Sequence, residues 1–316
     1  MGGIATLTVN PALDTSMTVG RVEPDMKNRC SRPARDPGGG GINVARAIME
    51  LGGEATAVFP CGGHTGEEIT DRLREDGLEF RCVWMDTSTR ENITIVEREG
   101  GRQFRFNTPG VELGPGTIGR CREAVLGRVE SGGIVVLSGS LPPGVGAGVY
   151  GEIIDTARER GMRTVLDTSG EALKAGVRAG PDLIKPNARE LGELVGREIV
   201  GLEDATEAAA HLVEDVGVGT VVVSLSTFGA SLVTKSERLT ARNPDVEAVS
   251  SIGAGDSMVA AITLALSRGL GAERMLADAV AAGCAAVMTP GTQLLRRSDY
   301  ERLRSEIDVR TSAAAG

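Results

Sequence analysis

The stretch that begins at residue 249 reads Val249-Ser250-Ser251-Ile252-Gly253-Ala254-Gly255-Asp256-Ser257-Met258, and an apolar helical run follows it at once. Its two glycines allow a tight backbone turn in which several N–H groups face one point. The helix that follows places its positive end at that point, which makes the loop an anion site. Asp256 is a carboxylate inside this site, where it suits the removal of a proton from a hydroxyl that attacks a phosphate. The simpler interpretation is a helix start with an aspartate favoured by the helix dipole.

The rest of the chain alternates short apolar runs with longer amphipathic ones. Some short runs, such as Ile134-Val135-Val136-Leu137, are continuously apolar, which is typical of strands covered on both faces. This alternation predicts an α/β fold in which helices cover both faces of a mostly parallel sheet. We expect strands at residues 4–9, 55–59, 134–138, 164–167, 183–185 and 220–225, and helices at 42–51, 66–75, 117–129, 149–160, 188–195, 202–216, 255–268 and 272–288.

Two stretches break this alternation, at residues 15–22 and 80–106. Both alternate apolar with polar residues in the manner of strands, and Gly100-Gly101 marks a hairpin in the second. We therefore expect a small accessory sheet from residues 15–35 and 80–108, standing off the main sheet as a lid or subunit contact. An antiparallel edge of the main sheet is the alternative. Residues 1–310 would form one domain, followed by a disordered tail at 311–316.

Composition argues against several classes of protein. The chain has 316 residues and a net charge of −9 without a long basic run, which argues against nucleic acid as a partner. No segment reaches the roughly 18 apolar residues of a membrane span. Only His64 and His211 are present, so a His-centred zinc site or a Ser-His-Asp triad would need His64, and no GxSxG nucleophile elbow accompanies it. The cysteines are Cys30, Cys61, Cys82, Cys121 and Cys284, an odd number without CxxC spacing, which predicts reduced thiols in a cytoplasmic protein.

Two further motifs stand where a helix is expected to begin. Residues 38–41 are four glycines that run directly into a helix, so their N–H groups can approach a ligand closely. A flexible linker is the alternative interpretation of that run. Asn187 and Glu190 lie three residues apart at a junction from strand to helix. They suit magnesium, which keeps much of its water and leans on substrate phosphates, or simply a helix-capping box.

Other polar residues follow expected strands. Residues 224–229 offer hydroxyls and a glycine at the carboxyl edge of the sheet, where open α/β sheets bind ligands. A plain hairpin turn explains that segment equally well. Asp14 and Ser138 also lie where strands end. Arg90 and Arg105 lie in the expected accessory sheet, where they could reach an anion or form a solvated face.

Taken together and in this order, these motifs resemble the PfkB (ribokinase-like) carbohydrate kinase family. The resemblance extends from Ile4 to Ile307 and is specific, because an early glycine-rich motif is paired with a late Gly-Ala-Gly-Asp motif. It implies a three-layer α/β/α sandwich with a small β-sheet lid that is often paired between two subunits, and hence a homodimer. The motifs that carry it are Asp14, residues 38–45, residues 138–142, Lys185-Pro186-Asn187 with Glu190, and residues 253–256.

Within this family the chain is most similar to the 6-phosphofructokinase branch. The 1-phosphofructokinases and tagatose-6-phosphate kinases usually carry lysine at the third place of the glycine run, which here is Gly40. The resemblance therefore implies ATP-dependent phosphorylation of fructose 6-phosphate at its 1-hydroxyl, a glycolytic reaction. Those two kinases, and a non-catalytic sugar-phosphate sensor, are the alternatives. Lys27 also matches the pattern of this branch, and the resemblance implies that Lys27 helps to bind a second, inhibitory ATP.

The resemblance implies a role for each motif. Asp256 would be the base, and the N–H groups of Gly253, Ala254 and Gly255 would stabilise the phosphoryl group in transfer. The other implied ligands are Asp14, Gly39, Gly40, Asn43, Arg90, Arg105 and Ser138 for the sugar phosphate; Lys185, Asn187, Ser224, Ser226, Gly229 and Cys284 for ATP; Asn187 and Glu190 for Mg²⁺; and Ser250, Ile252, Ala286 and Gly291 for K⁺.

Overall fold

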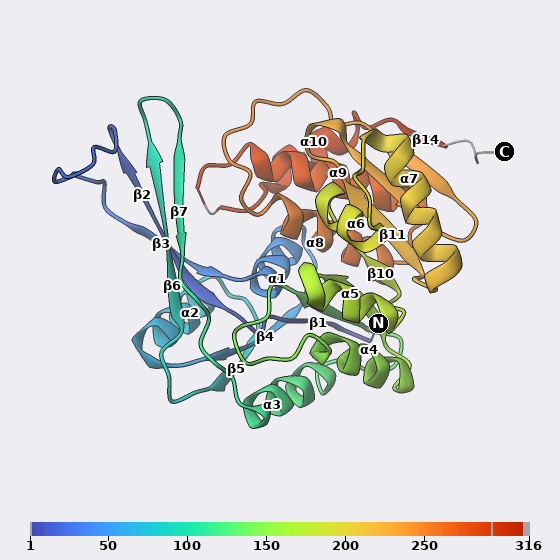
Figure 1. Ribbon diagram of the computed structural model, residues 1–316, viewed down its shortest axis with the longest axis horizontal. Coiled ribbons are helices and arrows are strands. Elements are labelled where there is room, and N and C mark those ends of the chain that lie inside the picture. The colour runs from blue at the N-terminus through green and yellow to red at the C-terminus, as the bar shows by residue number, and fades with distance from the viewer. Residues whose placement is uncertain (1, 292, 312–316) are drawn as a thin grey trace.

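A large sheet runs through the centre of the protein in the computed structural model, which describes residues 2–291 and 293–311 (Figure 1). Neighbouring strands are parallel from β11 to β5 and antiparallel from β11 to β14, so the expected mostly parallel sheet is confirmed. The strand order is β14 (Val309–Thr311), β13 (Arg238–Ala241), β12 (Ala230–Val233), β11 (Thr220–Ser224), β10 (Leu183–Ile184), β9 (Arg163–Asp167), β8 (Ile134–Ser138), β1 (Ile4–Leu7), β4 (Thr56–Cys61) and β5 (Phe80–Trp84).

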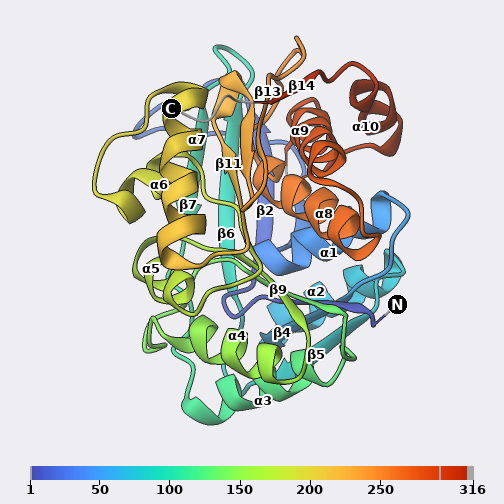
Figure 2. The ribbon, with the colours of Figure 1, turned by 90° about the vertical axis from the view of Figure 1, so that its right-hand side faces the viewer.

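Helices cover both faces of this sheet, as Figure 2 shows with α8 and α9 on one side and α6 and α7 on the other. One face carries α1 (Gly40–Glu50), α2 (Gly63–Glu75), α8 (Ala254–Ser267), α9 (Ala272–Val287) and α10 (Arg297–Arg304). The other carries α3 (Pro115–Leu126), α4 (Val149–Glu159), α5 (Gly170–Arg178), α6 (Ala188–Val195) and α7 (Gly201–His211), with the π-helical turn η1 (Leu212–Val216) after it.

Two hydrophobic cores result, one on each face of the sheet. In β8 the side chains of Ile134 and Val136 enter one core, and those of Val135 and Leu137 enter the other. All four are fully buried, which explains the continuous apolar run in the sequence. Burying apolar area at about 25 cal/mol per Å² on both faces makes this strand a major source of stability.

A second, four-stranded sheet, which we call the lid, stands off the main one (Figure 1). Its strands lie in the order β3 (Ala34–Gly38), β2 (Ala12–Val19), β6 (Arg90–Glu97) and β7 (Gln103–Asn107). The expected boundary at residue 80 is wrong, because Phe80–Trp84 is β5 and pairs in parallel with β4 at the edge of the main sheet. An edge strand with one open face has the same alternating pattern as a lid strand, so periodicity could not separate them.

The end of the chain also differs from expectation at one residue. Thr311 is the last residue of β14, which pairs antiparallel with β13, so the expected disordered tail does not include it. The rest of that expected tail, residues 312–316, lies outside the described residues. Within the described ranges, no helix combines the length and the apolar character that a membrane span requires.

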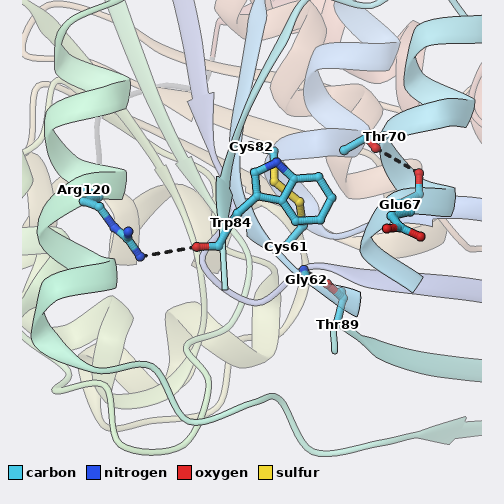
Figure 3. The surroundings of a disulfide bond; sticks show 8 residues. All are labelled: Cys61, Gly62, Glu67, Thr70, Cys82, Trp84, Thr89 and Arg120. Carbon is cyan, nitrogen blue, oxygen red and sulfur yellow. Dashed lines mark hydrogen bonds between the residues drawn. A yellow bond between two sulfur atoms is a disulfide. The ribbon is translucent and has the colours of Figure 1, made fainter. Parts of the chain in front are cut away.

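Cys61 and Cys82 form a disulfide between β4 and β5, with their Cα atoms 6.0 Å apart (Figure 3). The expectation of five reduced thiols is therefore wrong for this pair, whereas Cys30, Cys121 and Cys284 are free. The reason is the strand pairing, which sets Phe59 opposite Cys82 and places the two cysteines diagonally across adjacent strands. The sequence shows only a separation of 21 residues that spans α2, so the contact is invisible until the pairing is known.

We expect this disulfide to stabilise the fold measurably. Closing a loop of this length removes conformational entropy from the unfolded chain worth about 3 kcal/mol. Urea unfolding of the Cys61→Ser/Cys82→Ser variant should therefore show a lower free energy of unfolding than the oxidised wild type, with Cys30→Ser, a substitution of an exposed free thiol, as the matched control. An unfolding midpoint that is the same in the double variant and the wild type would contradict a stabilising disulfide.

Candidate active site

Asp256 lies in the first turn of α8, directly after the tight turn that the sequence predicts. Gly253 is the N-cap residue and adopts a left-handed conformation with φ of 75°, which favours glycine. No side chain caps this helix, and the first N–H groups of an α-helix have no intrahelical acceptor. The backbone N–H groups at the start of α8 are therefore available to an anionic ligand beside the Asp256 carboxylate.

Asn43 on α1 donates a hydrogen bond from Nδ2 to Oδ2 of Asp256, at 2.9 Å. The pKa of Asp256 is raised to about 7, first by burial and then by the negative charge of Asp167. The hydrogen bond from Asn43 and the positive charge of Lys185 act in the opposite direction. A carboxyl group with a pKa near neutrality is suited to accept a proton at physiological pH.

Lys185, just after β10, is a buried cation surrounded by carboxylates. Its Nζ lies 3.3 Å from Oδ1 of Asp167. Burial acts to lower the pKa of Lys185, but the negative charges of Asp167 and Glu190 outweigh it, so the pKa is raised. The side chain therefore stays charged next to Asp256. A fixed positive charge at this depth favours an anionic ligand such as a phosphate.

Asp14 lies where the lid joins the main sheet. Its Oδ1 accepts a hydrogen bond of 2.8 Å from Asn92 Nδ2, because the pairing of β2 with β6 sets these two residues opposite each other. Burial raises the pKa of Asp14. A Cβ atom at Gly38 would lie only 2.1 Å from Oδ2 of Asp14, so the first glycine of the run makes room for this carboxylate.

Ser138 ends β8 and meets the glycine run at the start of α1. Its hydroxyl is buried and has no hydrogen-bond partner among the described residues. A Cβ atom at Gly40 would lie 2.3 Å from this hydroxyl, so the two residues are in close contact only because position 40 is glycine. The unused hydroxyl and the free N–H groups of the run are available to a polar ligand.

The two arginines expected near a phosphate do not lie together in this chain. Arg90 donates to the carbonyl oxygens of Asn10, Pro11 and Thr108, at 3.0, 3.3 and 2.9 Å, and its positive charge opposes the rise in the pKa of the neighbouring Asp14 that burial causes. Arg105 is exposed on β7 and contacts the side chains of Gln103 and Ser251 instead. Arg90 thus belongs to the Asp14 group, and Arg105 does not contact that group within this chain.

Most of the expected nucleotide residues lie at or after the ends of two adjacent strands, and Cys284 lies on a helix. Lys185 and Asn187 follow β10, and the backbone N–H of Ser224 at the end of β11 donates to the carbonyl of Pro186. The loop after β11 turns at Ser226 and at Gly229, both with positive φ, and a Cβ atom at Gly229 would lie 2.0 Å from the carbonyl of Ala241. Cys284 is a buried residue of α9, where burial raises the pKa of its thiol to about 11, so the thiol stays protonated.

Asn187 and Glu190 form a complete capping box at the start of α6. Asn187 Oδ1 accepts from the N–H of Glu190 at 2.9 Å, and Glu190 Oε2 accepts from the N–H of Asn187 at 3.0 Å. The capping interpretation is therefore confirmed, and each side chain keeps further lone pairs for a ligand. No group of three or more His, Cys, Asp or Glu side chains within residues 2–291 and 293–311 is arranged to hold a metal ion.

The residues expected around potassium meet beside the start of α8. Ser250 Oγ donates to the carbonyl of Gly291 at 3.1 Å and accepts from the N–H of Ile252 at 3.2 Å. The carbonyl of Ala286 accepts from the hydroxyl of Thr289, at 2.8 Å. The N–H of Ser250 also donates to the carbonyl of Val287, the residue after Ala286, which brings the end of α9 beside Ser250. Lys27 is exposed in the long loop between β2 and β3.

The motifs in the sequence assigned no functional role to two residues of the site, Asn92 and Asp167. Asn92 orients Asp14, and Asp167 partners Lys185 and raises the pKa of Asp256. The signal that could have found Asp167 is its place at the end of the strand expected at residues 164–167. Asn92 lies inside a polar row of a lid strand, and only the pairing of β6 with β2 reveals its partner.

Comparison with known proteins places this geometry in context. The family model described as pfkB family carbohydrate kinase matches residues 8–298. The chain is 42% identical over 301 residues to the ATP-dependent 6-phosphofructokinase isozyme 2 of Escherichia coli K12, which covers 95% of this chain and 97% of that protein. Two solved structures of phosphofructokinase-2 from Escherichia coli are each 40% identical in sequence to this chain, and the match covers 97% of this chain and 99% of each of theirs. One is a potassium complex, with a TM-score of 0.93, and the other is a tetrameric inhibited form, with a TM-score of 0.91.

Proposed function

This chain belongs to the pfkB family of carbohydrate kinases, and we propose that it transfers the γ-phosphoryl group of ATP to the 1-hydroxyl of fructose 6-phosphate. The products are ADP and fructose 1,6-bisphosphate, and the hydroxyl proton is released. The observation that carries the proposal is the half-buried Asp256 carboxyl, with a pKa of about 7, beside the uncapped start of α8. The 42% sequence identity of this chain with an ATP-dependent 6-phosphofructokinase supports the choice of sugar.

Asp256 takes the proton from the sugar hydroxyl as the oxygen attacks the γ-phosphorus. The backbone N–H groups of Gly253, Ala254 and Gly255 are assigned to the equatorial oxygens of the phosphoryl group, where negative charge collects in the transition state. Lys185 adds a fixed positive charge to the same region. Because Asp256 must be ionised to act as a base, kcat is expected to fall as the pH drops below about 7.

The sugar phosphate is assigned to the side of the site nearest the lid. Asp14, Gly39, Gly40, Asn43 and Ser138 offer carboxylate, amide, N–H and hydroxyl groups to the sugar hydroxyls. Arg90 is assigned to the 6-phosphate, supported by its place beside Asp14, and Arg105 is assigned to the same group on the strength of the family resemblance. Closure of the lid over this side would exclude water from the transfer.

ATP and its cations are assigned to the opposite side. The nucleotide ligands are Lys185, Asn187, Ser224, Ser226, Gly229 and Cys284. Mg²⁺ would neutralise the phosphates, held by Glu190 and Asn187 directly or through water, since carboxylate and amide oxygens suit that ion. The hydroxyl and carbonyl oxygens of Ser250, Ile252, Ala286 and Gly291 suit K⁺, and the potassium complex of a similar enzyme supports this assignment.

Exposed residues of the lid and of the loop that carries Lys27 bear on assembly and regulation. The lid exposes the apolar side chains of Ile93 and Phe106, which suits pairing of two lids in a homodimer. Lys27 is assigned to a second, inhibitory ATP, and a similar enzyme has a solved structure in a tetrameric inhibited form. We place the protein in the cytoplasm, where ATP and sugar phosphates are found, with no nucleic acid or membrane partner.

A panel of acceptors tests the proposed substrate. With ATP and Mg²⁺, kcat/KM should be highest for fructose 6-phosphate and at least tenfold lower for fructose 1-phosphate and tagatose 6-phosphate, about 1.4 kcal/mol in transition-state binding. A preference for fructose 1-phosphate or tagatose 6-phosphate would replace the proposed function by one of the alternative kinases. Binding of sugar phosphate without any turnover would instead indicate a sensor.

Glu190→Gln separates the metal role of Glu190 from its capping role. Glutamine can replace glutamate in a capping box, so α6 should remain capped, while the negative charge is lost. The concentration of Mg²⁺ at half-maximal rate should therefore rise several-fold. Glu193→Gln, one turn along the same helix and paired with Arg189, is the matched control and should leave that concentration unchanged. An identical Mg²⁺ titration for Glu190→Gln and wild type would restrict Glu190 to capping.

A further inference from the structure

Two buried threonines of the region around β1 hold the first turn of α1. Thr8 Oγ1 accepts a hydrogen bond from the N–H of Ile42 at 2.9 Å, and Thr6 Oγ1 donates to the carbonyl of Gly41 at 2.7 Å. Both threonines are almost completely buried. Thr8 is also fixed by its own N–H, which donates to the carbonyl of Val58 on β4. The start of α1 is therefore attached to the centre of the main sheet.

The helix needs this attachment because it has no cap of its own. Its N-cap residue is Gly39, with φ of 118°, and no side chain supplies a capping hydrogen bond within the helix. The first backbone bond of α1 runs from Asn43 N–H to the carbonyl of Gly39, which leaves the N–H groups of residues 40–42 without intrahelical acceptors. Thr8 provides the acceptor for Ile42 from another element, in place of the usual N-cap side chain.

The glycine run lets the helix approach Thr8 this closely. A Cβ atom at Gly39 would lie 2.6 Å from Cγ2 of Thr8, and one at Gly41 would lie 2.7 Å from its Oγ1. Two of the four glycines thus serve contact with Thr8, in addition to leaving backbone N–H groups free for a ligand. The hydroxyl of Thr8 takes the N–H of Ile42 and leaves those of Gly40 and Gly41 free.

The next residue after Ile42 is Asn43, whose amide meets Asp256. We propose that Thr8 is a positioning residue for phosphoryl transfer: its hydroxyl fixes the N–H of Ile42 and thereby sets where the Asn43 amide meets the Asp256 carboxylate. This inference rests on the proposed function, in which Asp256 is the base. A shift of the first turn by a fraction of an ångström would lengthen the 2.9 Å bond from Asn43 and weaken the support that this bond gives to the ionised carboxylate.

The consequence can be read from the ionisation of the base. The hydrogen bond from Asn43 lowers the pKa of Asp256 against the effect of burial, so a weaker bond raises that pKa. The other groups that act on Asp256 are Asp167 after β9, Lys185 after β10 and Asp14 in β2. A substitution of the threonine hydroxyl leaves those three in place. A shift in the pKa of Asp256 would therefore report a change in the hydrogen bond from Asn43.

The test compares isosteric and conservative variants by their profiles of kcat against pH at saturating ATP and fructose 6-phosphate. Thr8→Val keeps the shape and removes the hydroxyl, and should lower kcat at pH 7 by about tenfold, the equivalent of one buried hydrogen bond. Its acid limb should move to higher pH, so that kcat approaches the wild-type value in alkaline buffer. Thr8→Ser keeps the hydroxyl and should retain the wild-type limb.

Thr6→Val, two residues before Thr8 and against the same helical turn, is the matched control. The carbonyl of Gly41 also accepts an N–H within α1, so it remains paired when the Thr6 hydroxyl is lost, and the acid limb should stay in place. If Thr8→Val does not fold, Thr8→Cys replaces it, because a thiol of similar size is a weak acceptor. Variant and wild type are compared by thermal unfolding to verify the fold.

Each outcome bears on one conclusion. An acid limb near pH 7 in the wild type that Thr8→Val does not move would overturn the role of Thr8 alone. A loss in Thr8→Ser as large as in Thr8→Val would also overturn it, because packing and not the hydroxyl would then be responsible. A wild-type enzyme without any acid limb near pH 7 would overturn the base assignment of Asp256, and this inference with it.

Discussion

The hydrogen bond between Asn43 and Asp256 joins the two helix starts on which the whole site depends. The two residues are 213 positions apart in the sequence, one at the start of α1 and the other at the start of α8. The N-cap residue of each helix is a glycine, which has no side chain to cap the first N–H groups of the helix. Sugar and phosphate can therefore be bound by backbone groups from both sides, and the acid that links the two helices lies between them.

The chemistry depends on a balance between burial and partners at Asp256. Burial alone would keep this carboxyl protonated, and the nearby charge of Asp167 acts in the same direction. Asn43 and Lys185 restore part of the ionised population. A carboxylate with stronger partners would be a weaker base, and one without them would be uncharged at neutral pH. The arrangement that Thr8 fixes on one side and Asp167 and Lys185 fix on the other sets this balance.

The sequence predicted elements well where one physical signal dominated. β8 and α6 have the predicted bounds, since a continuous apolar run and a capping box mark them. α10 was not expected, because only Tyr300 and Leu303 in it are buried and its arginines hide the apolar period. The edge strand β5 and the disulfide of Cys61 were missed for one shared reason. Both are defined by pairing with β4, which no local pattern reveals. In the site, motifs identified Asp256 and Lys185, whereas Thr8 and Asn92 act only through partners far away in sequence.

The most direct test of this account is the turnover of Asp256→Asn, measured across pH with fructose 6-phosphate, ATP and Mg²⁺. Asparagine matches aspartate in size, so the variant should fold and bind both substrates, while kcat should fall by about 10²–10⁴-fold and lose its acid limb. Turnover close to that of the wild type, or an acid limb that persists unchanged in the variant, would show that another group accepts the proton.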